Sequence, residues 1–136
     1  MFIQKILDFF KPSIQEKSIR IEQDENISML HPRGTTITLF SYRVPHKSKL
    51  TITHFSNYLN LPGHWSHVIW SIRRNGVGVS PYGAILDQTG LSTQPRLINR
   101  LIFNGGDELI ITATDDNSIA QPPELATGVA IRYEAT

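Results

Sequence analysis

From Thr35 to the end of the chain, the sequence reads as a series of short β-strands, and this pattern limits the possible folds. Segments rich in Thr, Ile, Val, Phe and Tyr suit a pleated, half-buried surface. Gly, Pro, Asn and Asp separate these segments about every 10–15 residues. Parallel strands need crossovers of about a dozen or more residues, usually helical, and this part of the sequence shows no helical periodicity. The sequence therefore predicts an all-β protein with antiparallel sheets.

The turn residues define seven or eight expected strands. Asn75-Gly76 predicts a type I′ hairpin, because both residues accept the positive φ that this turn requires. Trp70 alternates with Val68 and Ile72 and is expected in the core. The segment 108–114 begins apolar on both faces, so it should be a central strand. The expected strands cover residues 35–44, 50–55, 67–73, 77–80, 97–103, 108–114 and 127–134.

Strands of this number and length close naturally as a β-sandwich of jelly-roll type, which we assign to residues 34–136. An immunoglobulin-like sandwich and a small open barrel are the alternatives. Residues 57–64 are expected to form a loop, with Leu61-Pro62-Gly63 at its centre. The order of the strands cannot be derived from the sequence.

Residues 1–33 differ from the rest and are expected to form an N-terminal arm. The apolar residues of segment 2–10 fall at i, i+3 and i+4 spacings, which predicts a short amphipathic helix that ends before Pro12. The segment 17–22 alternates and allows a short strand. A helix of this length is marginal alone in water, so its apolar stripe needs a partner surface. The stripe is the predicted docking element and consists of Phe2, Ile3, Ile6, Leu7 and Phe10.

The chain has 136 residues, no cysteine and a net charge of +1, but its charges are unevenly distributed. Residues 34–103 carry seven basic groups and one acidic group, whereas residues 104–136 carry one basic group and six acidic groups. If strands from the two regions pair, these charges cancel; if they stay apart, the surface has two faces suited to contact with copies or partners. The near-neutral charge predicts no nucleic-acid partner, and no apolar run is long enough to span a membrane.

The residues that could carry chemistry do not form a recognisable catalytic or metal-binding set. His64 and His67 have a spacing that could hold zinc, but a site needs a third protein ligand. Asp107 and Glu108 are adjacent in an expected strand and so point to opposite faces, which prevents a converging dyad. Residues 115–117 could give oxygen ligands to calcium, although a solvated turn is the simpler reading. The sequence therefore predicts no enzyme, no cofactor and no metal.

Aromatic residues in expected loops raise a second possibility. Tyr58, Trp65 and Tyr82 lie in or beside predicted loops, where exposed rings can stack on sugar rings. This pattern is compatible with a carbohydrate-binding module, for which these three residues are the candidate contacts.

The rhythm of the strands resembles that of the small jelly-roll proteins of tailed-phage particles, especially capsid cement or decoration proteins. The resemblance covers about residues 35–136 and lies in segments 70–76, 81–83, 101–114 and 128–133, with an Asn-Gly hairpin and a strand entered through Gly106-Asp107. It implies a protein without catalysis that forms a symmetric oligomer, such as a homotrimer, on the particle surface.

The resemblance also implies that the N-terminal segment docks onto the major capsid protein or another virion protein. The predicted function is thus a non-enzymatic structural protein of the virion, made in the host cytoplasm. The alternative is a carbohydrate-binding β-sandwich module in a phage receptor-recognition apparatus.

Overall fold

A computed structural model describes residues 21–59, 68–85, 93–115 and 124–136 of the chain. These residues form eight β-strands and no helix. Among them there is accordingly no helix able to cross a membrane. The helix predicted at residues 2–10 lies outside the described residues. The prediction of an all-β protein is confirmed for the part of the chain that the structure describes.

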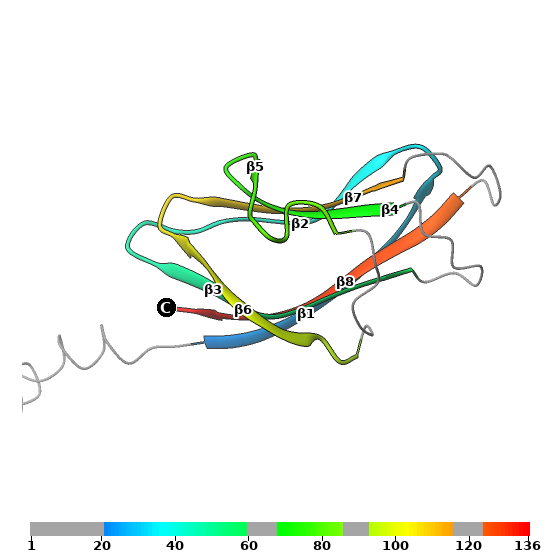
Figure 1. The fold of residues 1–136 in the computed structure, drawn as a ribbon. Helices are drawn as coiled ribbons and strands as arrows, with labels where there is room; N and C mark the ends of the chain where they lie inside the picture. The colour runs from blue at the N-terminus through cyan, green and yellow to red at the C-terminus, as the bar shows by residue number, and fades with distance from the viewer. Residues whose placement is uncertain (1–20, 60–67, 86–92, 116–123) are drawn as a thin grey trace, which may run out of the picture.

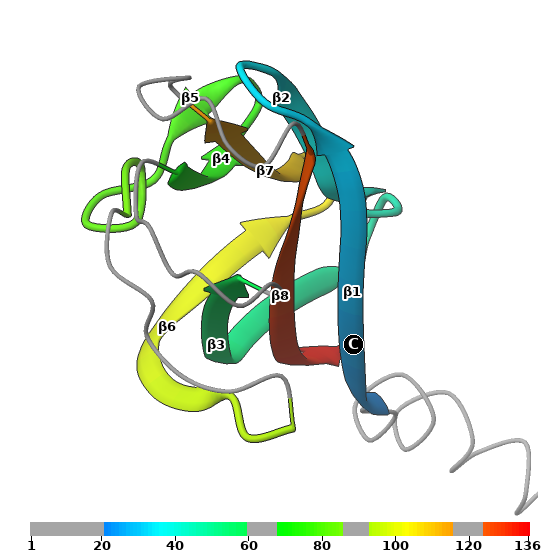
Figure 2. The same ribbon diagram turned by 90° about the vertical axis from the view of Figure 1, so that its right-hand side faces the viewer.

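The strands form two four-stranded antiparallel sheets that face each other as a β-sandwich (Figure 1). Figure 2 shows the two layers, with the second sheet above the first. The first sheet has the order β1-β8-β3-β6 and consists of β1 (Ile21–Pro32), β8 (Glu124–Ala135), β3 (Lys49–Leu59) and β6 (Arg96–Asn104). The second sheet has the order β2-β7-β4-β5 and consists of β2 (Thr36–Arg43), β7 (Glu108–Asp115), β4 (Val68–Arg74) and β5 (Val77–Gly78).

The core lies between the two sheets and follows the alternation of the sequence. In β7, every second residue is buried, and Ile111 is the register partner of Ile72 in β4. Trp70 is 1% exposed, as predicted, and Phe103 of the first sheet is fully buried. The segment 108–115 lies between β2 and β4, so the prediction of a central strand is confirmed. Burial of about ten large apolar side chains at roughly 1.5–3 kcal/mol each is the main stabilising contribution.

The predicted Asn75-Gly76 hairpin joins β4 to β5, with φ values of 52° and 85° at its two residues. The Asn75 side chain also bonds the turn that precedes β7: its Nδ2 donates to Asp107 Oδ1 at 3.1 Å, and its Oδ1 accepts from the backbone of Glu108 at 2.8 Å. The backbone N–H of Asn104 donates to Asp107 Oδ2 at 2.9 Å. These bonds, from Asn104 first and Asn75 next, lower the pKa of Asp107. One asparagine thus holds two neighbouring turns together.

The structure differs from the expected boundary between arm and body. Residues 21–32 form β1, which pairs with β8 over its whole length, from Ile21 with Ala135 to Pro32 with Glu124. This segment is an edge strand of the first sheet and not part of a free arm. This strand was not predicted over its full length because most residues of β1 are exposed, as is usual at the solvated edge of a sheet. Its sequence therefore lacks the apolar alternation of the other strands.

Several strands also differ in length from the prediction, β3 and β5 among them. The third strand of the first sheet, β3, continues through residues 57–59, which were expected to belong to a loop. It continues because β8 offers pairing partners as far as Thr127, opposite Leu59. The strand after the Asn75-Gly76 turn covers only Val77–Gly78, shorter than the predicted 77–80.

Candidate functional site

The predicted sugar contact Tyr58 is not available at the surface. It lies in β3 and is 8% exposed. Its ring covers Gly128, its register partner in β8, so closely that an added Cβ at Gly128 would overlap the ring. Its hydroxyl donates to Asn26 Oδ1 in β1 at 2.5 Å, and burial raises its pKa. Tyr58 therefore ties three strands together, and the expectation of a loop position is wrong.

The second predicted contact, Tyr82, is half-buried and packs against the core. Its ring centroid lies 6.5 Å from that of Phe55. Together with Ile85 and Ile98, these rings line an apolar cavity of about 200 Å³ beside β6. The third contact, Trp65, lies outside the described residues, as do His64 and His67. The two described candidates thus serve packing and do not form an open aromatic platform.

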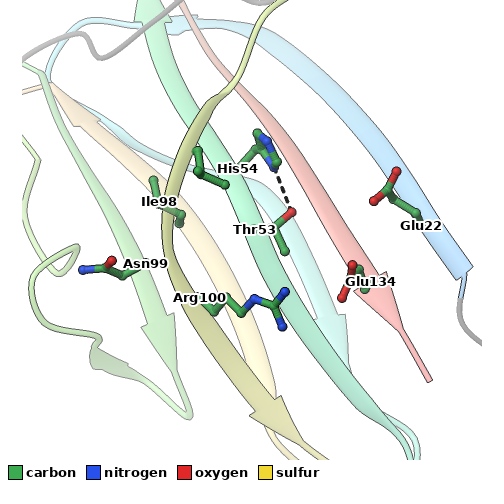
Figure 3. Close-up of a pocket in the computed structure, with 8 residues that line it drawn as sticks. Glu22, Thr53, His54, Ile98, Asn99, Arg100 and Glu134 are labelled. Atoms are coloured by element: carbon green, nitrogen blue, oxygen red, sulfur yellow. Dashed lines mark hydrogen bonds between the residues drawn. The ribbon is translucent and has the colours of Figure 1, made fainter.

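A cleft of about 450 Å³ lies on the outer face of the first sheet (Figure 3). All four strands of the sheet contribute side chains to it. Figure 3 shows Thr53 and His54 on β3 at its floor, with Glu22 and Glu134 to one side and Arg100 to the other. Its lining residues are Glu22, Thr53, His54, Leu97, Ile98, Asn99, Arg100 and Glu134.

Within the cleft, Thr53 lies close to two hydrogen-bond partners. The Thr53 hydroxyl donates to the carbonyl oxygen of Arg132 at 3.2 Å. The Thr53 hydroxyl also lies 2.9 Å from His54 Nδ1, and the imidazole tautomer decides which of the two groups donates. Among the residues that the structure describes, no three His, Asp or Glu side chains lie together as metal ligands.

A charged pair lies in the interior, where the sequence suggested a solvated turn. Asp115 is 2% exposed, and its carboxylate accepts two hydrogen bonds from Arg33, at 2.9 Å and 3.0 Å. The backbone N–H of Gly34 adds a third at 2.6 Å. The Asp115 carboxylate therefore stabilises the corner between β1 and β2, where Arg33 and Gly34 lie. The expectation of a solvated turn is wrong for this residue. Residues 116 and 117 lie outside the described part of the chain.

His31 forms a second buried polar link at the same corner. It is 4% exposed. Its Nδ1 lies 2.9 Å from the hydroxyl of Thr35, and its Nε2 lies 3.1 Å from the hydroxyl of Thr127 in β8. Burial, the largest effect, lowers the pKa of His31. The imidazole thus connects β8 to the corner in its neutral form.

The exposed large apolar side chains of the described residues all lie on edge strands. Each sheet has two edges, β1 and β6 in the first and β2 and β5 in the second. Leu97 on β6 is 76% exposed, Val77 on β5 is 69% exposed and Leu30 on β1 is 60% exposed. The complete set is Ile21, Met29, Leu30, Tyr42, Val77, Leu97 and Ile102. Sequence reasoning missed these residues, because periodicity indicates which face a side chain occupies but not which strand is at an edge.

The predicted docking residues Phe2, Ile3, Ile6, Leu7 and Phe10 lie outside the described residues. Their role stays a prediction. The sequence matches no model of a known protein family, and no curated protein matches it.

Proposed function

We propose that this chain is a non-enzymatic structural protein of a virion, a capsid cement or decoration protein that binds the shell of a tailed phage as a symmetric oligomer such as a homotrimer. The observation that carries the proposal is the position of the exposed apolar side chains on the edge strands. Unpaired strand edges with apolar side chains are templates for contact with other chains. A molecule with such edges on both sheets is suited to assembly.

The strand order supports a jelly roll as the finer description of the sandwich. β1 pairs with β8, β2 with β7, β3 with β6 and β4 with β5. The first four strands pair in reverse order with the last four, as in one long hairpin. The pairs β1–β8 and β3–β6 lie in the first sheet, and the pairs β2–β7 and β4–β5 lie in the second. Jelly rolls of this kind have eight strands, whereas immunoglobulin-like sandwiches have about seven or nine. Capsid and particle-surface domains are among the proteins that use this architecture.

The N-terminal sequence supports a second contact with the shell. The apolar stripe of residues 2–10 precedes β1 along the chain. A docked stripe adds about 1.5–3 kcal/mol for each fully buried large side chain, before the cost of ordering. Because the stripe is linked to the folded body, its binding becomes intramolecular once the body is attached.

The test is co-sedimentation with tailed-phage capsid shells prepared without decoration protein. The wild-type chain should sediment with the shells at a fixed ratio to the capsid protein. Deletion of residues 1–12 should weaken binding at least tenfold and leave the circular dichroism of the β-domain unchanged. As a matched control, replacing the polar residues Gln4 and Lys5 by Ser should have little effect. A wild-type chain that stays in the supernatant would overturn the proposal, and unchanged binding of the deletion variant would remove the arm from it.

The carbohydrate-binding alternative has less support, because Tyr58 is buried and Tyr82 packs on Phe55. It depends on Trp65, and the replacement Trp65→Ala should then abolish glycan binding without changing the melting temperature. A wild-type chain that binds nothing on a glycan array removes this alternative.

A further inference from the structure

The two edges of the first sheet differ in charge. The strand β1 contains Glu22, Asp24 and Glu25 and no Lys or Arg, whereas β6 contains Arg96 and Arg100 and no Asp or Glu. Both arginines are exposed, and neither has an ion-pair partner among the described residues. Each edge also carries exposed apolar side chains, Ile21 on β1 and Leu97 and Ile102 on β6 among them. The sheet therefore has one acidic edge and one basic edge.

Glu25 on β1 and Arg96 on β6 lie at the same height in the sheet. The register joins Glu25 to Ile131, Ile131 to Phe55 and Phe55 to Arg96, in one row across all four strands. Ile131 and Phe55 are core residues, so Glu25 and Arg96 lie toward the inner face at opposite ends of this row. Glu22 and Arg100 both line the cleft on the outer face (Figure 3). On the outer face, the row of Glu22 runs through Glu134 and Thr51 and ends at Ile102, two residues along β6 from Arg100.

The strand directions allow identical copies to meet at these edges. All pairings in the first sheet are antiparallel, so four alternating strands place β1 and β6 in opposite directions. A second copy can be related to the first by rotation about an axis that runs along the strands. This rotation keeps the strand directions, so β1 of the second copy lies antiparallel to β6 of the first copy. It also involves no movement along the strands, so residues of equal height stay at equal height. A rotation of this kind repeats head to tail and forms a ring when the rotation closes.

We propose that the β1 edge of one copy docks against the β6 edge of a second copy of this chain. In this contact Glu25 meets Arg96. Glu22 lies opposite Ile102, with Arg100 two residues away along β6, and Leu97 and Ile102 become covered. The contact ends near Ile102, because the Arg74 side chain donates to the carbonyl oxygen of Ile102 at 2.6 Å. The inference rests on the proposed function only for the existence of a symmetric oligomer; the edges and the orientation come from the structure.

A cysteine cross-link tests the geometry directly, because the chain contains no cysteine. In the double variant Glu25→Cys/Arg96→Cys, the two sulfurs of one chain are separated by three strand spacings, about 14 Å, which is too far for a disulfide. Mild oxidation should therefore yield covalent multimers of the 15.4 kDa chain on a non-reducing gel. The matched control is Met29→Cys/Arg96→Cys, in which the β1 cysteine lies four residues, or about 13 Å, further along the strand. The control should remain monomeric on the gel, and equal cross-linking of both variants would overturn the proposal.

Charge reversal tests the recognition in solution. The variants Glu22→Lys/Glu25→Lys and Arg96→Glu/Arg100→Glu should each weaken self-association at least tenfold in sedimentation velocity at low salt. In the variant with all four replacements, the charges of the two edges are exchanged. This variant should therefore form an oligomer of the same mass as the wild-type chain. Lys47→Glu/Lys49→Glu makes the same change in net charge as Arg96→Glu/Arg100→Glu, at two exposed residues where the turn after β2 enters β3, and should keep the wild-type mass. A monomeric wild-type chain would overturn the proposal. A variant with all four replacements that is folded but stays monomeric would also overturn it.

The two proposals fail in different ways. A chain that forms the cross-linked ring but does not sediment with capsid shells keeps this interface and loses the proposed function. A chain that binds shells as a monomer keeps the proposed function and loses the interface.

Discussion

The corner between β1 and β2 offers the largest expected effect of a single substitution away from the apolar core. The replacement Asp115→Asn keeps the size of the side chain and removes its charge. Arg33, whose side chain is 5% exposed, then loses the carboxylate that accepts two of its hydrogen bonds. The Asp115 side chain it faces is fully buried, so water cannot replace the lost carboxylate without opening the corner.

The magnitude follows from this burial. Removing one partner of a buried ion pair leaves an uncompensated charge and costs about 3–5 kcal/mol. For a domain of this length, each kcal/mol shifts the melting temperature by about 3–5 °C, so the expected loss is about 10–20 °C. The double variant Arg33→Gln/Asp115→Asn removes both charges and should recover part of the loss, because no buried charge then remains unpaired.

The assay is urea unfolding followed by tryptophan fluorescence, since Trp70 lies in the core. The matched control is Asp24→Asn, which removes a carboxylate that binds Arg132 at 2.7 Å at the surface, where the two side chains are 63% and 37% exposed. Because solvent screens exposed pairs, this control should change the midpoint far less. If Asp115→Asn and Asp24→Asn shift the urea midpoint equally, the buried pair does not have the role assigned to it here.

Three further substitutions test other parts of the fold. Gly128→Ala places a Cβ against the Tyr58 ring and should cost about 1–3 kcal/mol in urea unfolding, with loss of the hydrogen bond to Asn26; a neutral effect would show that the ring does not fill this space. Gly76→Ala has open space for its Cβ but a φ of 85°, so only backbone strain of about 1–2 kcal/mol is expected, and a larger loss would contradict this account. Because burial lowers the pKa of His31, the unfolded chain binds its proton more tightly than the folded chain, and the free energy of unfolding should fall as the pH drops below about 6.5. His31→Gln should reduce the dependence of the unfolding free energy on pH between pH 5 and 8. An unchanged dependence would show that other groups cause it.

Where the sequence-based predictions succeeded, the signals were local. Asn75-Gly76 specifies its turn through two adjacent φ angles, and the alternation around Trp70 specifies its buried face. Where they failed, the missing information was distant in the chain. Tyr58 is buried because Gly128 leaves room for its ring, and Asp115 is buried because Arg33 lies opposite it.

By itself, the sequence determined that the chain forms antiparallel strands with a buried apolar face, because side-chain alternation and turn residues act over a few neighbouring positions. Only the tertiary structure decided which strands lie at the edges, since this depends on pairings such as that of β1 with β8 between the two ends of the body. The acidic edge of β1 and the basic edge of β6 exist only in that arrangement. In the sequence, Glu25 and Arg96 are 71 residues apart, and the register row through Ile131 and Phe55 brings them to one height.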